Sequence, residues 1–243
     1  MKTYKLSWQD LFETDGKPNA DIWTHETGGY GFGNQEAQYY TDRLSNCYVK
    51  QGHLHIIALK EAYENCNYTS AKLTTYQKKH IQCGRIEVMA KLPQGHGTWP
   101  AIWLLGENMK KGAGWPLCGE IDMMEHVGHN PNHVHFSLHT KNAHLHLNNQ
   151  PNKAFYVEHL IEGFHEYALN WTKDSMTFYL DQKEQVTFTK KPGATIEDWP
   201  FNQPFYLILN LALGGTWGGP IDDDALPSEF IFKYVKVYEE VTL

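Results

Sequence analysis

The stretch Gly119-Glu120-Ile121-Asp122-Met123-Met124-Glu125-His126 places three carboxylates within six residues, separated by apolar side chains. Because side chains of a β-strand alternate between the two faces of a sheet, Glu120 and Asp122 share one face. In a regular strand Glu125 would point to the other face. One extra residue at Met123–Met124, a β-bulge, would return Glu125 to the side of Asp122. The pattern therefore predicts a bulged strand with all three carboxylates on one face.

Two carboxyl groups that face a groove are suited to glycoside hydrolysis. Retaining glycosidases hold the pair about 5–5.5 Å apart, one as nucleophile and the other as acid/base. We expect repulsion to raise the pKa of one member of the group, so that it keeps a proton near neutral pH. The alternative is that the acids only face solvent. Acidic residues are depleted in strands and like charges on one face cost free energy, which argues against that alternative.

The run Glu120-Ile121-Asp122-Met123-Met124-Glu125 resembles the signature Glu-x-Asp-x-x-Glu of glycoside hydrolase family sixteen, in the bulged form typical of its laminarinase-like members. The resemblance extends over most of the chain. It implies an all-β fold, a β-jelly-roll sandwich of two antiparallel sheets with a concave substrate cleft. It also implies that Glu120 is the nucleophile, that Glu125 is the acid/base, and that Asp122 assists between them.

Other runs that resemble this family imply substrate contacts. Residues 33–40 read Gly-Asn-x-Glu-x-Gln-Tyr-Tyr, residues 97–103 read Gly-x-Trp-Pro-Ala-x-Trp, and residues 210–215 read Asn-Leu-Ala-x-Gly-Gly. The first run lines the glycone end of the family's cleft, and the tryptophans are sugar platforms or walls. The implied substrate-binding residues are Asn34, Glu36, Arg85, Trp99, Trp103, Trp115, His139, Asn210 and Trp217.

Several of these positions also have a structural explanation. Arg85 and Glu87 lie on a half-polar strand face and could form an ion-paired surface. Trp99 and Trp103 share a face and could be a core pair, since tryptophan is highly buried on average. The glycine-rich residues 28–40 read as a loop and could be a flexible connector.

Histidines crowd the segment after the acidic strand: His126, His129, His133, His135, His139, His144 and His146. Three of them share a strand face, which would suit a metal ion. Their spacing lacks the carboxylates or helical intervals of ordered catalytic metal sites, and we expect no metal or other cofactor. The resemblance implies that His139 reaches toward Asp122, and we expect the other histidines on the surface or in loops.

Many family members bind a structural calcium ion through acidic residues at two positions where this chain has Leu11 and Lys233. Calcium needs oxygen ligands, and a lysine ammonium would repel it. We therefore expect no calcium at that site.

Short strands separated by turns are predicted along the chain. We expect residues 68–75 to pair with 84–92, and residues 164–171 to form a hairpin with 175–181. Residues 214–219 are expected to be a loop at the cleft edge. The remaining predicted strands cover residues 5–13, 46–50, 53–59, 205–213 and 229–239.

The length of 243 residues suits one β-sandwich domain, residues 1–243. The net charge of −7 argues against nucleic acid or a polyanionic substrate. No apolar run approaches the roughly 18 residues of a membrane span. Cys47 and Cys118 look like small buried residues, and spacing alone leaves a disulfide open. We expect a monomer located outside the cell, on its surface or in the periplasm. The first residues do not resemble a signal peptide, so a cytosolic location is the alternative.

These observations predict a retaining endo-β-glucanase for β-1,3-glucan or mixed-linkage β-1,3/1,4-glucan. Two alternatives stay open at this point. One is a transglycosylase that uses the same covalent intermediate, and the other is a non-catalytic glucan-binding protein. Relatives of the second kind typically lose the glutamates, whereas Glu120 and Glu125 are both present here.

Overall fold

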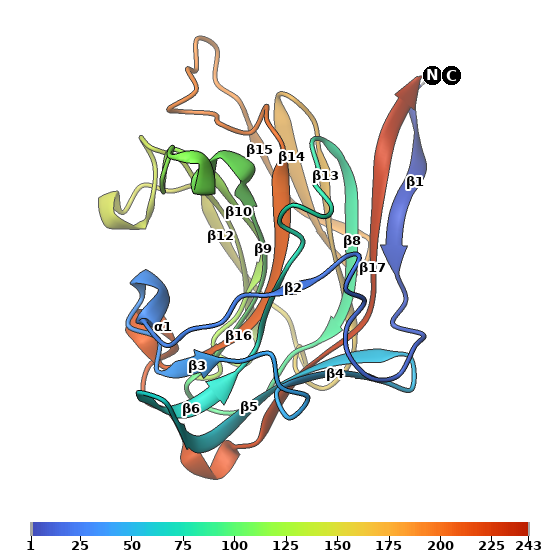
Figure 1. Cartoon of the computed structure of the whole chain (residues 1–243). Coiled ribbons are helices and arrows are strands. Elements are labelled where there is room, and N and C mark those ends of the chain that lie inside the picture. Colours follow the sequence, from blue (N-terminus) through green and yellow to red (C-terminus); the bar gives the residue numbers. More distant parts are fainter. Residues whose placement is uncertain (1, 243) are drawn as a thin grey trace.

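The computed structural model describes residues 2–242 and is built almost entirely of β-strands. Two sheets stack face to face, with the strands around β10 in one layer and those around β8 and β17 in the other (Figure 1). All strand pairs are antiparallel except β3 with β6. The predicted all-β jelly roll of two sheets is confirmed.

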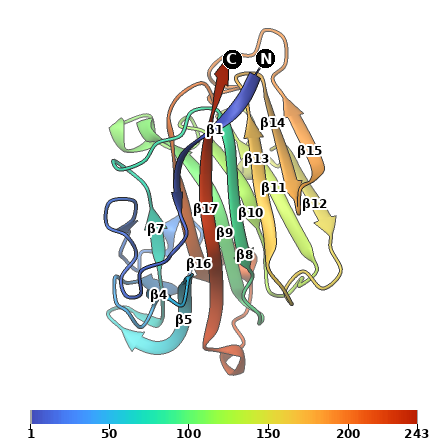
Figure 2. The same ribbon diagram turned by 90° about the vertical axis from the view of Figure 1, so that its right-hand side faces the viewer.

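The first sheet has ten strands. Its order is β15 (Lys183–Thr189), β14 (Ser175–Leu180), β13 (His165–Trp171), β8 (Gly84–Lys91), β17 (Ser228–Thr242), β5 (His53–Tyr63), β6 (Cys66–Ser70) and β3 (Gln38–Tyr40). Two further strands pair at its side: β1 (Lys2–Asp10) runs along β17, as Figure 2 shows, and β4 (Cys47–Lys50) pairs with β5.

The second sheet has seven strands and carries the acidic stretch. Its order is β12 (Asn152–Tyr156), β11 (His133–His139), β10 (Glu120–Glu125), β9 (Thr98–Gly106), β16 (Phe205–Leu213), β7 (Lys72–Thr74) and β2 (Thr24–His25). Helical structure is limited to short turns: α1 (Gly215–Gly218), η1 (Gly31–Gly33), η2 (Glu107–Lys111), η3 (Leu145–Leu147) and η4 (Asp223–Ala225). None of the helices in residues 2–242 has the length and apolar character needed to cross a bilayer.

The core lies between the two sheets and is filled from both by alternate side chains. In β8 the odd-numbered positions from Arg85 to Lys91 face outward, while Ile86, Val88 and Ala90 are fully buried. In β10 the bulge residues Met123 and Met124 are both fully buried in this core. Burial of these two neighbours on one side is what leaves the acids to the other face.

The structure corrects several local predictions. Residues 68–75 do not pair with 84–92: β6 pairs with β5 and β3, β7 pairs with β16 and β2, and β8 pairs with β13 and β17. Such pairs join distant parts of the chain, so adjacency in sequence is a poor guide to them. The segment 28–40 contains the turn η1 and the strand β3, and the segment 214–219 contains α1, so neither is only a loop. The hairpin of β13 and β14 is confirmed.

None of the four cysteines, all within residues 2–242, forms a disulfide, and Cys47 and Cys118 are buried as predicted. Burial raises the pKa of the Cys118 thiol to about 12, so the thiol stays protonated. These two cysteines therefore act as small packing residues.

Candidate active site

A cleft of about 660 Å³ crosses the outer face of the seven-stranded sheet. Glu26, which follows β2, and Lys72 on β7 lie at one end of the cleft. Ser137 on β11 and Asn152 on β12 lie at the other end, and β10 runs between these two ends. A chain of sugars that lay in this cleft would therefore run across the strands and pass over the carboxylates.

The bulge in β10 brings the three carboxylates into this cleft. Against β11, Asp122 pairs with Ser137, and the next paired residue is Glu125, opposite His135. Against β9, Asp122 pairs with Trp103 and Glu125 with Ala101. Since Glu120, Asp122 and Glu125 all line the cleft, the prediction that they share one face is confirmed.

Indole N–H groups hold the two outer carboxylates. Trp115 Nε1 donates to Glu120 Oε2 at 3.0 Å, and Trp99 Nε1 donates to Glu125 Oε1 at 3.2 Å. Each bond joins a flexible carboxylate to a rigid ring, which restricts where the carboxylate can point. The two tryptophans thus orient the acids as well as line the cleft.

His139 lies beside Asp122, the middle one of the three carboxylates, as predicted from the sequence. Its Nε2 is 3.1 Å from Asp122 Oδ2 and 3.7 Å from Glu120 Oε1. Asp122 is 2 % exposed and His139 is 5 % exposed, so this contact is almost shut off from water. A protonated imidazole here would stabilise the negative charge of the group.

Burial raises the pKa of all three carboxyl groups to about 8. For Glu120 and Glu125 the neighbouring Asp122 adds to this rise, and the indole hydrogen bonds and His139 oppose it. The sequence analysis expected a raised pKa for one member only, through repulsion. Burial is the larger cause, and because it acts on each acid it raises the pKa of every member.

A chain of hydrogen bonds supports the cleft floor on the side of β16. Trp103 Nε1 donates to Asn210 Oδ1 at 2.6 Å, and Asn210 Nδ2 donates to Tyr40 OH at 3.0 Å. Tyr40 OH in turn donates to Glu36 Oε2 at 3.1 Å. Burial raises the pKa of Glu36, although hydrogen bonds from Gln38 and Tyr40 and the charge of Lys72 oppose the rise. Asn210 and Glu36 both line the cleft and both hold the floor together.

Trp217 and Asn34 both line the cleft and come from neighbouring segments. The ring of Trp217 on α1 stands edge-on to Trp99, with centroids 5.4 Å apart. The backbone oxygen of Asn34 accepts a hydrogen bond from Thr216 N at 2.8 Å. The glycine-rich loop and α1 therefore close the same side of the cleft.

The prediction that Arg85 contacts the substrate is wrong, because Arg85 lies on the ten-stranded sheet and the cleft crosses the seven-stranded one. It projects from the outward face of β8, where its Nε is 2.6 Å from Glu87 Oε1 and its Nη1 donates to Asn170 Oδ1 at 2.9 Å. It is absent from the lining of the cleft. The ion-paired surface explanation is the right one, since the core of the sandwich separates Arg85 from the carboxylates.

Lys72 and Glu26 line the cleft although the sequence did not predict them as site residues. Lys72 is 7 % exposed, its Nζ is 3.0 Å from Glu26 Oε2, and it lies over the rings of Phe32 and Trp103. Lys110 contacts the same glutamate at 3.3 Å. The available signal was a lone charge in the strand Lys72-Leu73-Thr74, which needs a partner when buried.

His126, His129, His144 and His146 lie outside the strands, as predicted, whereas His133 and His135 are half-buried on β11. His126 is fully buried and its Nδ1 donates to the backbone oxygen of His133 at 2.8 Å. His144 and His146 place their rings against Trp115, with centroids 5.2 and 5.4 Å away, and His146 lines the cleft. Packing decides these positions, which alternation within a strand cannot predict.

Glu120, Asp122 and His139 are the one group among the described residues whose ligand atoms converge, all within 4.8 Å, and could hold a metal ion. Carboxylate and imidazole ligands suit several divalent transition metals. However, Trp115 already donates to Glu120, and His139 faces Asp122.

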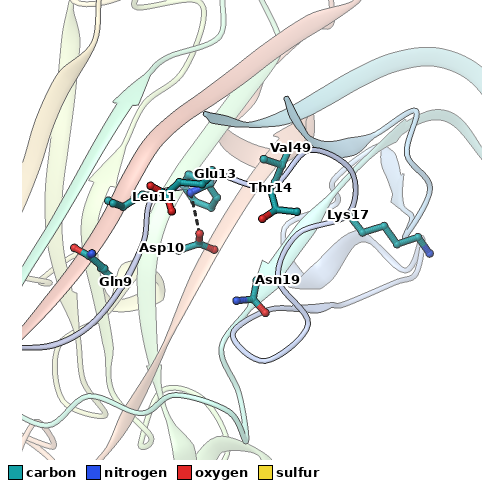
Figure 3. Close-up of a pocket in the computed structure, with 9 residues that line it drawn as sticks. Gln9, Asp10, Leu11, Glu13, Thr14, Lys17, Asn19 and Val49 are labelled. Carbon is teal, nitrogen blue, oxygen red and sulfur yellow. Dashed lines mark hydrogen bonds between the residues drawn. The ribbon is translucent and has the colours of Figure 1, made fainter. Parts of the chain in front are cut away.

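A second pocket lies near the end of β1, away from the cleft. Leu11, Glu13 and Asn19 help to line it, and Lys17 extends away from Asp10 (Figure 3). Asp10 uses both carboxylate oxygens internally, accepting from Phe12 N at 2.9 Å and from Trp23 Nε1 at 2.8 Å. No catalytic arrangement is formed by these lining residues.

A two-sheet β-sandwich that presents a row of acids between tryptophans in a groove across one sheet has the architecture of glycosidases acting on long polysaccharides. This chain belongs to glycoside hydrolase family 16: the family model "Glycosyl hydrolases family 16" matches residues 32–225.

Relatives agree with this assignment. The chain is 43 % identical over 246 residues to "Beta-glucanase" of Rhodothermus marinus. The aligned region covers 98 % of this chain and 86 % of that protein. The crystal structure of a laminarinase from Rhodothermus marinus matches with a TM-score of 0.96 and 42 % identity over the whole of both chains. A "Beta-1,3-glucan-binding protein" of Penaeus monodon is 31 % identical, over 82 % of this chain and 72 % of that protein.

Proposed function

We propose that this protein is a retaining endo-β-glucanase that hydrolyses β-1,3-glucan or mixed-linkage β-1,3/1,4-glucan. The observation that carries the proposal is the bulged strand β10, which turns Glu120 and Glu125 into one cleft, each held by an indole N–H. A cleft that crosses the whole sheet suits attack within a chain rather than at its end. The names of the relatives support a glucan as the substrate.

The proposed reaction has two steps. Glu120 attacks the anomeric carbon while Glu125 gives its proton to the glycosidic oxygen, so the leaving sugar departs and a glycosyl-enzyme forms. Glu125, now ionised, then takes a proton from water, which attacks the anomeric carbon and releases Glu120. Burial raises the pKa of both Glu120 and Glu125 to about 8, so the pair keeps protons near neutral pH. Attack requires Glu120 to be the ionised member, a form that His139 and the Trp115 N–H favour, while Glu125 keeps the proton for the first step. Asp122, between the two, orients the nucleophile and is faced by His139.

We assign substrate contacts to the predicted residues that line the cleft: Asn34, Glu36, Trp99, Trp103, Trp115, His139, Asn210 and Trp217. We add Lys72 and Glu26 at the glycone end, and leave Arg85 out. The acids outnumber the lysines in this cleft, which favours a neutral glucan over an anionic polysaccharide. We further propose that residues 1–243 act as one catalytic domain, as a monomer and outside the cytoplasm.

The alternatives are a transglycosylase and a glucan-binding protein like the Penaeus monodon relative. A binding protein needs no paired acids. Here Glu120 and Glu125 are both present, and each accepts a hydrogen bond from a tryptophan. Hydrolysis and transfer share the first step and differ only in the acceptor. Product analysis with and without an added oligosaccharide acceptor separates them.

The test is digestion of laminarin, lichenan and barley glucan, with identification of the oligosaccharides released. We expect a mixture of oligosaccharides from the start, and NMR of the first products should show the β-anomer before mutarotation. Glu120→Gln should lose more than about 1,000-fold in kcat/KM, because the nucleophile is gone. Full activity in Glu120→Gln, or an initial α-anomer, would refute the proposed mechanism.

A further inference from the structure

The turn α1 is held by three different parts of the chain. Gly214 N donates to Gly97 O at 2.7 Å, and Thr216 N donates to Asn34 O at 2.8 Å. From the connection between β10 and β11, His129 Nδ1 donates to Gly218 O at 3.2 Å. The backbone of the turn is therefore tied to the start of β9, to the glycine-rich loop and to a histidine.

Glycines allow this turn to sit so close to its neighbours. Gly215 has a φ of +72°, and a Cβ there would lie 2.8 Å from Asn34 O. A Cβ at Gly218 would lie 3.1 Å from Gly97 O. Any side chain at Gly215 would push the turn outward and move the residue between these glycines, Trp217.

The ring of Trp217 is packed between two other rings. On one side it stands edge-on to His135, with centroids 4.8 Å apart and an interplanar angle of 88°. On the other side it stands edge-on to Trp99, at 5.4 Å and 86°. Edge-to-face pairs of this kind stabilise a defined orientation of both rings.

This packing leads to the acid/base. Trp99 Nε1 donates to Glu125 Oε1, and His135 is the cross-strand partner of Glu125 in the β10–β11 pair. A continuous set of contacts thus runs from His135 through Trp217 and Trp99 to Glu125.

We propose that His135 is a positioning residue for the acid/base: by packing Trp217 against Trp99, it keeps the indole N–H of Trp99 aligned on Glu125. His129 assists by fixing the turn that carries Trp217. This inference rests on the proposed function. His135 does not itself line the cleft, but it packs against Trp217, which does, so its effect passes through the two tryptophans.

The consequence falls on proton transfer. The indole hydrogen bond favours the ionised form of Glu125, and it fixes the direction from which the proton is delivered. The charged and titratable groups that face Glu125 are Asp122 and Glu120 on its own strand and His139 on β11. These groups stay in place when His135 is changed, so a shift in the behaviour of Glu125 reports on the indole contact.

The experiment compares His135→Ala and His135→Phe with the matched control His133→Ala. His133 lies two residues earlier on β11 and packs against Tyr156 instead of Trp217. Each variant is assayed on laminaritetraose, whose leaving sugar needs a proton, and on 2,4-dinitrophenyl β-laminaribioside, whose leaving group does not. kcat/KM is measured because it reports the first step alone.

We expect His135→Ala to lose about 10-fold or more in kcat/KM on laminaritetraose, and less than about 2-fold on the dinitrophenyl substrate. The alkaline limb of the pH profile of kcat/KM for His135→Ala should move to higher pH, because a weaker hydrogen bond from the Trp99 indole raises the pKa of Glu125. His135→Phe, which keeps a ring against Trp217, and His133→Ala should both resemble the unchanged protein. If the unchanged protein cleaves neither of these substrates nor lichenan, the proposed function fails.

If the unchanged protein cleaves both substrates, three results overturn the inference alone. The first is an equal loss of His135→Ala on both substrates, which indicates general damage to the structure. The second is activity of His135→Ala that matches the unchanged protein. The third is a loss in His135→Phe as large as in His135→Ala, which would assign the effect to the imidazole rather than to packing.

Discussion

Each carboxylate of the cleft has a protonation behaviour set mainly by its burial. Taking an acid out of water disfavours its charged form, so the folded chain binds these protons more tightly than the unfolded chain does. The pKa of Glu120 is raised to about 8 in this way. Glu26, at the end of the cleft, behaves in the opposite sense: burial raises its pKa, but Lys72 and Lys110 together outweigh burial and lower it.

These opposite shifts predict opposite effects on stability. An acid with a raised pKa destabilises the fold as pH rises from its unfolded value, about 4.3, through its folded value. Glu120→Gln should therefore raise Tm at pH 8 by about 3 °C or more and change little at pH 4. Scanning calorimetry at both pH values measures the difference.

Glu26→Gln is the matched control with the reverse sign. The stability that Glu26 contributes is present above its unfolded pKa and is lost as pH falls through its lower folded pKa. Glu26→Gln should lower Tm at pH 8, because Lys72 loses its charged partner in a buried place. A lower Tm for Glu120→Gln at pH 8 would show that the acids of the cleft do not oppose folding.

The bulge of β10 determines which way Glu125 points. Met123 and Met124 both enter the core, and the register against both neighbouring strands shifts between Asp122 and Glu125. Without the extra residue, the third acid would stand two positions after Asp122 in a regular strand and would face the cleft by simple alternation. The bulge and the odd spacing of the acids therefore compensate each other.

Deletion of Met124 tests this compensation. The remaining run Glu-Ile-Asp-Met-Glu alternates regularly, so the three acids should stay on the cleft face and at least about 1 % of kcat/KM on laminarin should remain. The exchanged variant Met124→Glu/Glu125→Met has the same composition as the original strand, but puts an acid in the core. It should lose more than about 1,000-fold and fold poorly.

Circular dichroism and thermal melts show whether each variant folds. A deletion variant that folds normally and is as inactive as the exchanged variant would contradict this account of the bulge.

The sandwich as a whole separates two polar surfaces that a strand pattern cannot tell apart. Arg85 and the three carboxylates of the cleft both lie on outward faces of strands, yet on opposite sheets. The apolar core lies between the two sheets, and the cleft lies on the outer face of the seven-stranded sheet only. Which outward face becomes the cleft is decided by the loops that rise around it, from residues 28–36, 107–115 and 141–150.

A calcium ion that stabilised the sandwich would also act on the whole molecule. Lys233 is exposed at a bulge of β17, and Leu11 lines the second pocket, so neither position offers a carboxylate. Because a ligand that binds only the folded chain raises Tm, millimolar calcium or excess EDTA should each change Tm by less than about 1 °C. A calcium-dependent rise in Tm that EDTA reverses would contradict this prediction.

The sequence alone determined the class of fold, the bulged strand, the three acids and eight of the nine predicted substrate-binding residues, which line the cleft, because strand alternation and the spacing of the acids are local properties. Only the tertiary structure decided the pairing of β6, β7 and β8, the place of Arg85, and the roles of Lys72, His126 and His146. These depend on which distant segments pack together. Burial, which sets the pKa of every acid in the cleft, arises only when both sheets and the surrounding loops are in place.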